Sequence, residues 1–217
     1  MIEIRFTPDS LPPWGAVLGA ALAALVTRSV AMGVLAGKPV TRLDAAVVKR
    51  LATALQRHGI GSNAGILLAP LVAEPAQTID AATQRRLEEG LSHLNEALEA
   101  SATPSAEWPS MREVFGDELL LDLLGVGATS LRRYASGERT TPDDVAARLH
   151  WLAMVVADLA GAYNNFGIRR WFERPRSQLQ GKSPRQVLGN AWSPDDEAAS
   201  RVRSLASVLS GAQPLAA

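Results

Sequence analysis

Residues 117–142, DELLLDLLGVGATSLRRYASGERTTP, have the pattern of two short helices joined by a tight turn. The first helix carries four leucines whose spacing places them along one apolar stripe: Leu119, Leu120, Leu123 and Leu124. Gly125 follows the last leucine, and glycine tolerates the left-handed conformation that ends many helices. The pattern therefore predicts a helix-turn-helix whose first helix ends at this glycine.

The second helix of the motif is expected from about Ala128 to Ser136. Leu131 and Tyr134 share one face through their i, i+3 spacing, whereas the two arginines between them point elsewhere. A recognition helix lies in the major groove with its N-terminal residues on base edges. A guanidinium suits both guanine edges and phosphates because its donors form a planar fork. The candidates for contact with DNA are Ala128, Thr129, Arg132, Arg133 and, after the helix, Arg139.

A plain helical bundle is the alternative interpretation of this motif, because a leucine-rich helix, a glycine turn and an arginine-bearing helix also occur in such bundles. Gly127 stands where a polar N-cap is preferred, and the side chain of Ala128 is too short to hydrogen-bond a base. If the motif binds DNA, we expect modest sequence readout.

A long helix is expected to open at Pro142, with Asp143 and Asp144 in its first turn, where acidic groups complement the helix dipole. Its apolar residues recur in alternating steps of four and three, which is typical of a helix packed along another helix. They are Val145, Leu149, Leu152, Val156, Leu159 and Tyr163. The stripe fits either a core or a dimer seam.

Residues 168–192, IRRWFERPRSQLQGKSPRQVLGNAW, combine aromatic residues with many cations. Trp171 and Phe172 stand beside Pro175, which stops the preceding helix from continuing. Six cations and a single acid, Glu173, surround this pair; the cations are Arg169, Arg170, Arg174, Arg176, Lys182 and Arg185. The excess of positive charge favours an acidic partner surface, and arginine and aromatic residues are enriched at interface hot spots. Alternatively, the aromatic pair is core and the arginines are simply solvated.

The pattern RRWFERP, followed by Leu179, Gly181, Lys182, Ser183, Pro184 and Leu188, resembles the toxin-binding domain of Xre/MbcA/ParS-type antitoxins. Residues 114–142 resemble the Xre-like helix-turn-helix that precedes this domain in the family, so the resemblance covers about Val114 to Leu209. It implies a small cytoplasmic bacterial protein that dimerises, neutralises a cognate toxin, commonly of the RES type that consumes NAD, and often represses its own operon. The toxin-binding candidates are then Arg170, Trp171, Arg174, Pro175, Leu179, Gly181, Lys182 and Pro184.

The sequence thus predicts an all-α protein in four parts. These are an N-terminal helical region at residues 1–100, a linker at 101–110, the Xre-like helix-turn-helix at 111–142 and the toxin-binding-like helical domain at 143–217. The linker is expected because Pro104 and Pro109 interrupt helical periodicity among small residues.

The N-terminal region carries no motif that indicates chemistry, and its role is unknown. Helices are expected at residues 14–35, 42–58 and 80–100, with a connection at 61–72, and IEIRF at residues 2–6 could form one short strand. The apolar faces of these helices favour an interaction or dimerisation module. A DNA-positioning element or a protective cover are the alternatives.

Composition excludes several classes of function. The formal net charge is +0, so any affinity for nucleic acid has to come from local patches. The chain has no cysteine, and His58, His93 and His150 stand in no metal-binding or catalytic spacing. No phosphate-binding glycine loop is present, so we expect no enzyme activity, metal or cofactor. The apolar run from Trp14 to Val26 is too short for a membrane span, and a buried helix is expected there.

The leading hypothesis is the antitoxin of a type II toxin-antitoxin system, cytoplasmic and homodimeric, with a RES-like toxin and operator DNA as partners. Two alternatives stay open: a stand-alone helix-turn-helix regulator without a toxin, and an interaction module that does not bind DNA. A toxin gene beside this one would separate the first from the second, and a DNA-binding assay tests the third.

Overall fold

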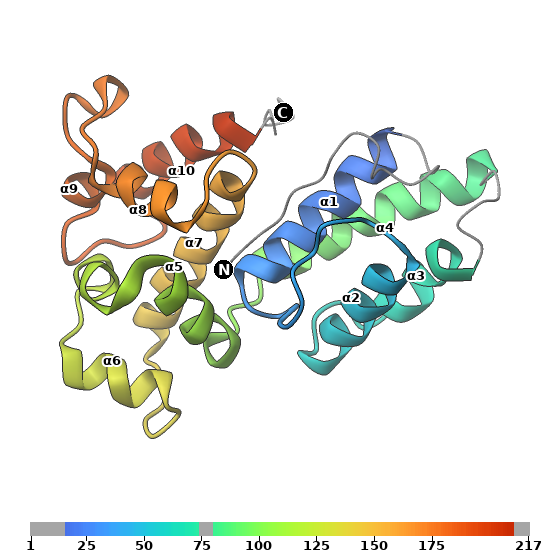
Figure 1. Ribbon diagram of the computed structural model, residues 1–217, viewed down its shortest axis with the longest axis horizontal. Helices are drawn as coiled ribbons and strands as arrows, with labels where there is room; N and C mark the ends of the chain where they lie inside the picture. Colours follow the sequence, from blue (N-terminus) through green and yellow to red (C-terminus); the bar gives the residue numbers. More distant parts are fainter. Residues whose placement is uncertain (1–15, 74–79, 211–217) are drawn as a thin grey trace. The chain divides into compact units, whose positions relative to one another are not determined.

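A computed structural model describes residues 16–73 and 80–210 of the chain. Over these ranges the chain forms ten α-helices and one short 3-10 helix and contains no β-strand (Figure 1). The prediction of an all-α fold is therefore confirmed. The strand expected at residues 2–6 and the last seven residues of the toxin-binding-like domain, 211–217, lie outside the described ranges.

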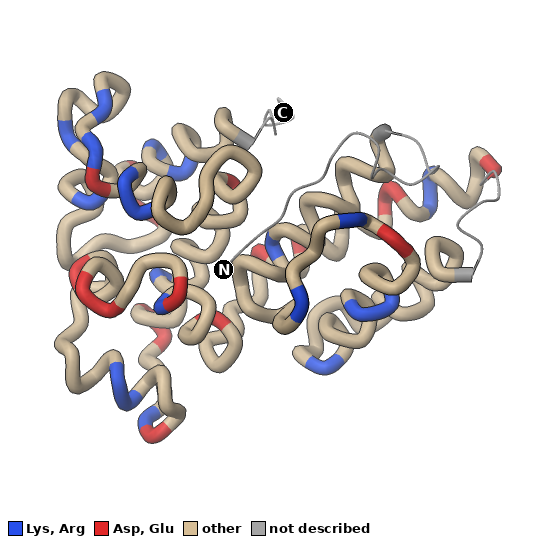
Figure 2. The backbone as a smooth tube through the Cα atoms, viewed as in Figure 1, with Lys and Arg blue, Asp and Glu red and all other residues tan. Residues whose placement is uncertain are grey.

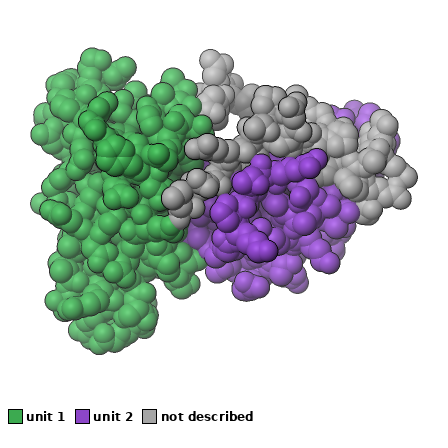
Figure 3. Space-filling model, in the orientation of Figure 1, with its two compact units in different colours: residues 1–2, 103–217 green, residues 3–102 purple. Residues whose placement is uncertain are grey.

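The described chain divides into two compact units between Ala102 and Thr103 (Figure 3). Unit 2 holds the N-terminal helices α1 (Ala16–Ala31), α2 (Ala45–Arg57), α3 (Ala64–Ala73) and α4 (Ala81–Glu99). In this unit α1 packs against α4, and α2 packs against α3. Its core consists mainly of buried leucines, among them Leu18, Leu22, Leu25, Leu51, Leu55, Leu91 and Leu98.

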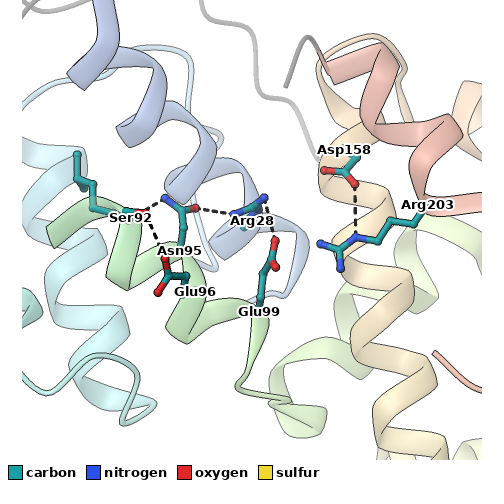
Figure 4. Close-up of polar contacts among 8 residues, drawn as sticks. Arg28, Ser92, Asn95, Glu96, Glu99, Asp158 and Arg203 are labelled. Atoms are coloured by element: carbon teal, nitrogen blue, oxygen red, sulfur yellow. Dashed lines mark hydrogen bonds and ion pairs between the residues drawn. The ribbon is translucent and has the colours of Figure 1, made fainter. Parts of the chain in front are cut away.

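One polar group joins α1 to α4 at the edge of this leucine core (Figure 4). Arg28 donates from Nη1 to Asn95 Oδ1 at 3.0 Å, and its Nη2 lies 3.0 Å from Glu99 Oε1. The buried helix expected within Trp14 to Val26 is present from Ala16 onward, with Leu18 and Leu22 fully buried.

Helix α3 corrects the expectation of a connection at residues 61–72. The segment has almost no polar residue, so no alternation of apolar and polar faces identifies it as a helix, and Pro70 lies inside it. The structure nevertheless buries Leu68 and Leu71 on one side, while Ile66 on the other side is 79% exposed.

Unit 1 is built around α7 (Asp143–Ala160), whose residues from Arg148 to Leu159 are all buried. Helices α5 (Pro104–Leu124) and α10 (Glu197–Ser210) pack against it, and Arg203 Nε lies 3.9 Å from Asp158 Oδ2 between α10 and α7 (Figure 4). The predicted stripe from Val145 to Leu159 is therefore core of its own unit, whereas its last residue, Tyr163, follows the helix and is only half-buried. The remaining elements are α6 (Ala128–Ala135), α8 (Asn165–Glu173), η2 (Ser177–Leu179) and α9 (Pro184–Leu188).

No single helix in the described ranges is both long and apolar enough to cross a membrane. The pair α7 and α8 reaches that length and apolarity only when taken together, and the two helices are bent by 113°.

The linker predicted at residues 101–110 is wrong for most of its length, because α5 begins at Pro104. Proline at the first position of a helix is harmless, since the amide hydrogen that it lacks has no partner there anyway. Trp108 is 1% exposed: its ring stacks on Tyr134 at 6.1 Å, and its Nε1 donates to Thr141 Oγ1 at 2.9 Å. The segment therefore packs against the helix-turn-helix and supports it.

The two helices and the glycine turn predicted within residues 117–142 are present. Gly116, with φ of 73°, breaks α5 into two helices, so the first helix of the motif begins at Asp117. Gly125 ends it with φ of 64°, and the amides of Gly125 and Val126 donate to Asp122 and Leu121, as in a Schellman motif. Helix α6 then begins at Ala128, which leaves a turn of three residues.

Two glycines of this motif allow a matched test of the fold. Gly125 and Gly137 both have positive φ, 64° and 74°, but a Cβ on Gly125 would lie 2.0 Å from the Asn190 carbonyl oxygen, whereas a Cβ on Gly137 would meet nothing within 4 Å. Gly137→Ala should lower the free energy of unfolding by about 1–2 kcal/mol because of the left-handed backbone. Gly125→Ala should lower it by a further ~1–3 kcal/mol, because the Asn190 backbone has to move. Urea denaturation measures both; equal decreases would contradict the close approach of Asn190.

Candidate protein-binding and nucleic-acid-binding surfaces

Helix α6 presents the predicted DNA-contacting residues to solvent. Leu131 and Tyr134 are 2% and 8% exposed and hold the inner face of the helix against α5. The residues on its outer side are exposed, as is the arginine that follows the helix. We call these residues the α6 surface: Ala128, Thr129, Arg132, Arg133 and Arg139.

The three guanidiniums of the α6 surface differ in their interactions with neighbouring side chains. Arg133 Nε lies 3.4 Å from Glu138 Oε1, and both side chains are exposed, so this ion pair is weak. Arg139 lies over the Tyr134 ring, with its guanidinium carbon 5.6 Å from the ring centre, and its backbone amide donates to Arg133 O. Arg132 has no carboxylate partner in the described part of the chain.

Helix α8 buries two of its aromatic residues against α5. Asn164 caps the helix by accepting from the Gly167 amide at 2.9 Å. Trp171 and Phe172 point inward, at 1% and 0% exposure, and Phe172 meets Phe115 of α5 edge to face with ring centres 5.1 Å apart. The interpretation of this aromatic pair as core is therefore correct.

The outer face of α8 and the loop after it form the second candidate site, which we call the α8 surface. Phe166 is 63% exposed, and the Arg170 guanidinium lies 5.6 Å from its ring centre. The other members of this surface are Arg169, Arg174 and Arg176. Phe166 is not among the residues predicted from the sequence, although its place four residues before Arg170 is the spacing of helical neighbours.

A depression of about 260 Å³ lies in the α8 surface. It is lined by Tyr163, Phe166, Gly167, Arg170, Trp171, Arg174 and Arg176. The Arg176 guanidinium lies 4.7 Å from the Trp171 ring centre. Burial is the main factor that lowers the pKa of Arg176, and its contact with Tyr163 acts in the opposite direction. The guanidinium keeps its charge, because the ordinary pKa of arginine lies far above neutral pH.

The structure splits the predicted toxin-binding residues into two groups. Arg170, Arg174, Pro175, Gly181 and Lys182 are exposed and available to a partner. Leu179 and Pro184 are buried, like Trp171, and hold the loop in place. The loop closes on itself, because the amide of Arg176 donates to Lys182 O at 3.0 Å and the amide of Gly181 donates to Arg176 O at 2.9 Å.

Ion pairing distinguishes these surfaces from the rest of unit 1. Figure 2 shows where the Lys, Arg, Asp and Glu residues lie along the chain. Arginines elsewhere in the unit have carboxylate partners, as does Arg133: the pairs are Arg112–Asp117, Arg133–Glu138, Arg148–Asp144, Arg185–Asp122, Arg201–Glu197 and Arg203–Asp158. The pair with Arg112 lowers the pKa of Asp117. Within the described part of the chain, the cations of unit 1 without such a partner are Arg132, Arg139, Arg169, Arg170, Arg174, Arg176 and Lys182. All seven belong to the α6 surface or to α8 and its loop.

Other chemistry has little support among the described residues. No group of three His, Asp or Glu side chains there could hold a metal ion. Glu107 and His150 form a buried pair, with Oε1 and Nδ1 2.7 Å apart, but this pair lies in the core between α5 and α7, away from the depression.

Comparisons with known proteins identify no relative: no family model, no curated protein and no solved structure matches this chain.

Two aromatic residues of α8 should differ in how much their truncation lowers the free energy of unfolding. Trp171→Ala removes a side chain that is 1% exposed and should lower the free energy of unfolding by about 3–5 kcal/mol. Phe166→Ala removes one that is 63% exposed and should change it by less than ~0.5 kcal/mol. Chemical denaturation of both variants measures the difference. A Trp171→Ala variant as stable as the parent would contradict the placement of this ring in the core.

Proposed function

We propose that this chain is the antitoxin of a type II toxin-antitoxin system. It binds and neutralises a RES-like toxin through the α8 surface, binds operator DNA through the α6 surface and thereby represses its own operon. In this proposal it acts as a homodimer in the bacterial cytoplasm. The resemblance of residues 114–209 to the antitoxin family is what suggests this class of protein. The distribution of unpaired cations is the structural observation that carries it.

Unpaired guanidiniums at the two surfaces favour anionic partners. Bringing several guanidiniums together without counterions costs electrostatic free energy, and an anionic partner recovers it on binding. In the rest of unit 1, Asp and Glu residues neutralise the arginines within the chain. At the α6 and α8 surfaces the chain supplies few such acids. External anions are therefore the natural counterions at both surfaces.

Each surface suits a different class of anion. On the α6 surface, Arg132 lies on the helix that follows a three-residue turn, and Arg139 lies just after that helix. A helix in this position reads the major groove in helix-turn-helix proteins. On the α8 surface, arginines surround an exposed phenylalanine, and arginine with aromatic residues is the composition of protein-interface hot spots.

DNA binding is tested by removing the two unpaired cations of the α6 surface. Arg132→Gln with Arg139→Gln should weaken binding to a duplex from upstream of the gene and should reduce the salt slope of log K by about 1 for each phosphate that the variant no longer neutralises. Arg201→Gln is the matched control, because Arg201 is exposed and lies on α10, outside both surfaces. Fluorescence anisotropy at several salt concentrations measures both quantities. Unchanged affinity and slope in the double variant would exclude α6 as the DNA-binding helix.

Toxin binding is tested by reversing charge at the α8 surface. Arg170→Glu with Arg174→Glu should abolish co-purification with the product of the adjacent gene and should restore that product's toxicity in cells, because both guanidiniums are exposed and have no carboxylate partner among the described residues. Arg201→Glu is the control and should leave the complex intact. Recovery of the complex with the charge-reversed variant would show that this surface is not the interface.

A further inference from the structure

The depression in the α8 surface has the features of a receptor for one acidic side chain. Arg170, Arg174 and Arg176 line it from the end of α8 and the start of the loop. None of the three has a carboxylate partner in the described ranges of the chain. Their charges therefore converge on one hollow instead of following an extended track.

Buried donors around the depression also lack acceptors. Trp171 is 1% exposed, and its indole Nε1 has no hydrogen-bond partner among the described residues. The Nε atom of Arg176, which also lines the depression, is likewise buried and has no hydrogen-bond partner there. A buried donor without an acceptor is costly, so an acceptor that enters here gains more than it would on the open surface. The indole N–H and the guanidinium N–H groups can all donate to oxygen atoms, and the positive charge of the guanidiniums favours oxygen atoms that carry negative charge.

The walls of the depression limit what else the ligand contains. Phe166 presents an apolar ring at the rim, held beneath the Arg170 guanidinium. A volume of about 260 Å³ admits one or two side chains but no folded element. Glu173 lies at the rim of the neighbouring hollow and disfavours a densely charged polyanion. Nucleic-acid strands are bound by cations that track the backbone, which is a different arrangement.

We propose that this depression binds a single Asp or Glu side chain, presented next to an apolar residue on a surface segment of the protein partner. The carboxylate is held by Arg170 and Arg174, with Arg176 and Trp171 at the floor, and the apolar neighbour packs on Phe166. The inference rests on the proposed function only in taking the partner to be the toxin. The recognition chemistry itself is independent of which protein binds.

The test uses the full chain and a tripeptide probe in a ¹H–¹⁵N NMR titration. Ac-Leu-Glu-Leu-NH2 should shift the indole Nε1–H signal of Trp171, which the Trp171→Phe variant assigns, and the shift should saturate. The isosteric Ac-Leu-Gln-Leu-NH2 should bind at least about tenfold more weakly, because it lacks the charge that the guanidiniums select. Arg170→Gln with Arg174→Gln should remove the difference between the peptides, and Arg201→Gln should preserve it.

Three results would overturn the proposal: no saturable shift with the acidic peptide, equal shifts with both peptides, or a stronger response to inorganic phosphate or to oligothymidine than to the acidic peptide. The outcome is separable from that of the toxin experiment. Selective peptide binding together with a toxin complex that survives charge reversal would retain the carboxylate site and reject the proposed interface. The converse pair of results would retain the interface and reject the carboxylate site.

Discussion

The arrangement of unit 1 depends on how the turn of the helix-turn-helix is held from the far end of the sequence. The indole Nε1 of Trp192 donates to the carbonyl of Leu123 at 2.7 Å, and this carbonyl belongs to the last turn of α5, where helical partners are missing. The Trp192 ring also meets Trp151 of α7 edge to face, with centres 4.7 Å apart. Gly125 lies so close to the Asn190 carbonyl that no side chain fits between them. The segment between α9 and α10 thus fixes the end of the helix that precedes α6.

Because the segment between α9 and α10 holds the end of α5, the helix-turn-helix shares one core with the helices that follow it. The helix-turn-helix and the helical region after it pack around the same buried helix, α7, so the α6 and α8 surfaces are two faces of one unit. Arg185 of α9 pairs with Asp122 of α5 and adds a second link between the same regions. Within the unit, the acids that neutralise arginines either join two helices in this way or pair with an arginine four or five residues away in the sequence. Because the whole chain is formally neutral, the unpaired arginines act as local charges and do not form part of a general positive field.

The sequence predicted those parts of the fold whose residues obey local rules. The leucine stripe before Gly125 and the pair Leu131 and Tyr134 determine two helices and the turn between them, and the structure has all three. Helix α3 could not be predicted in this way, because a segment of Ala, Gly and Leu carries no contrast between faces. The two prolines of the expected linker mislead for a different reason. Pro104 takes the first turn of α5, where proline is tolerated, and Pro109 lies inside α5 without ending it. Where the helix begins and whether it continues past a proline depend on tertiary packing.

The candidate site was predictable to a similar degree. Charge density identified the region around α8, but the sequence could not separate the buried Trp171 from the exposed Phe166, since both are aromatic and only the packing of α8 on α5 decides which one faces inward. The sequence also does not indicate which arginines form ion pairs with acidic residues. Arg185 and Asp122 are far apart in sequence and meet only in the folded unit, so charge alone does not distinguish Arg185 from the other cations around the aromatic pair.

Two separate cationic surfaces for two macromolecules are the central claim, and simultaneous occupancy tests it most directly. Native mass spectrometry of the purified chain, mixed with the product of the neighbouring gene and with the duplex upstream of its own gene, measures which complexes coexist. We predict one assembly that contains all three components. Mutually exclusive binding of the protein and the duplex, or binding of neither, would contradict the claim.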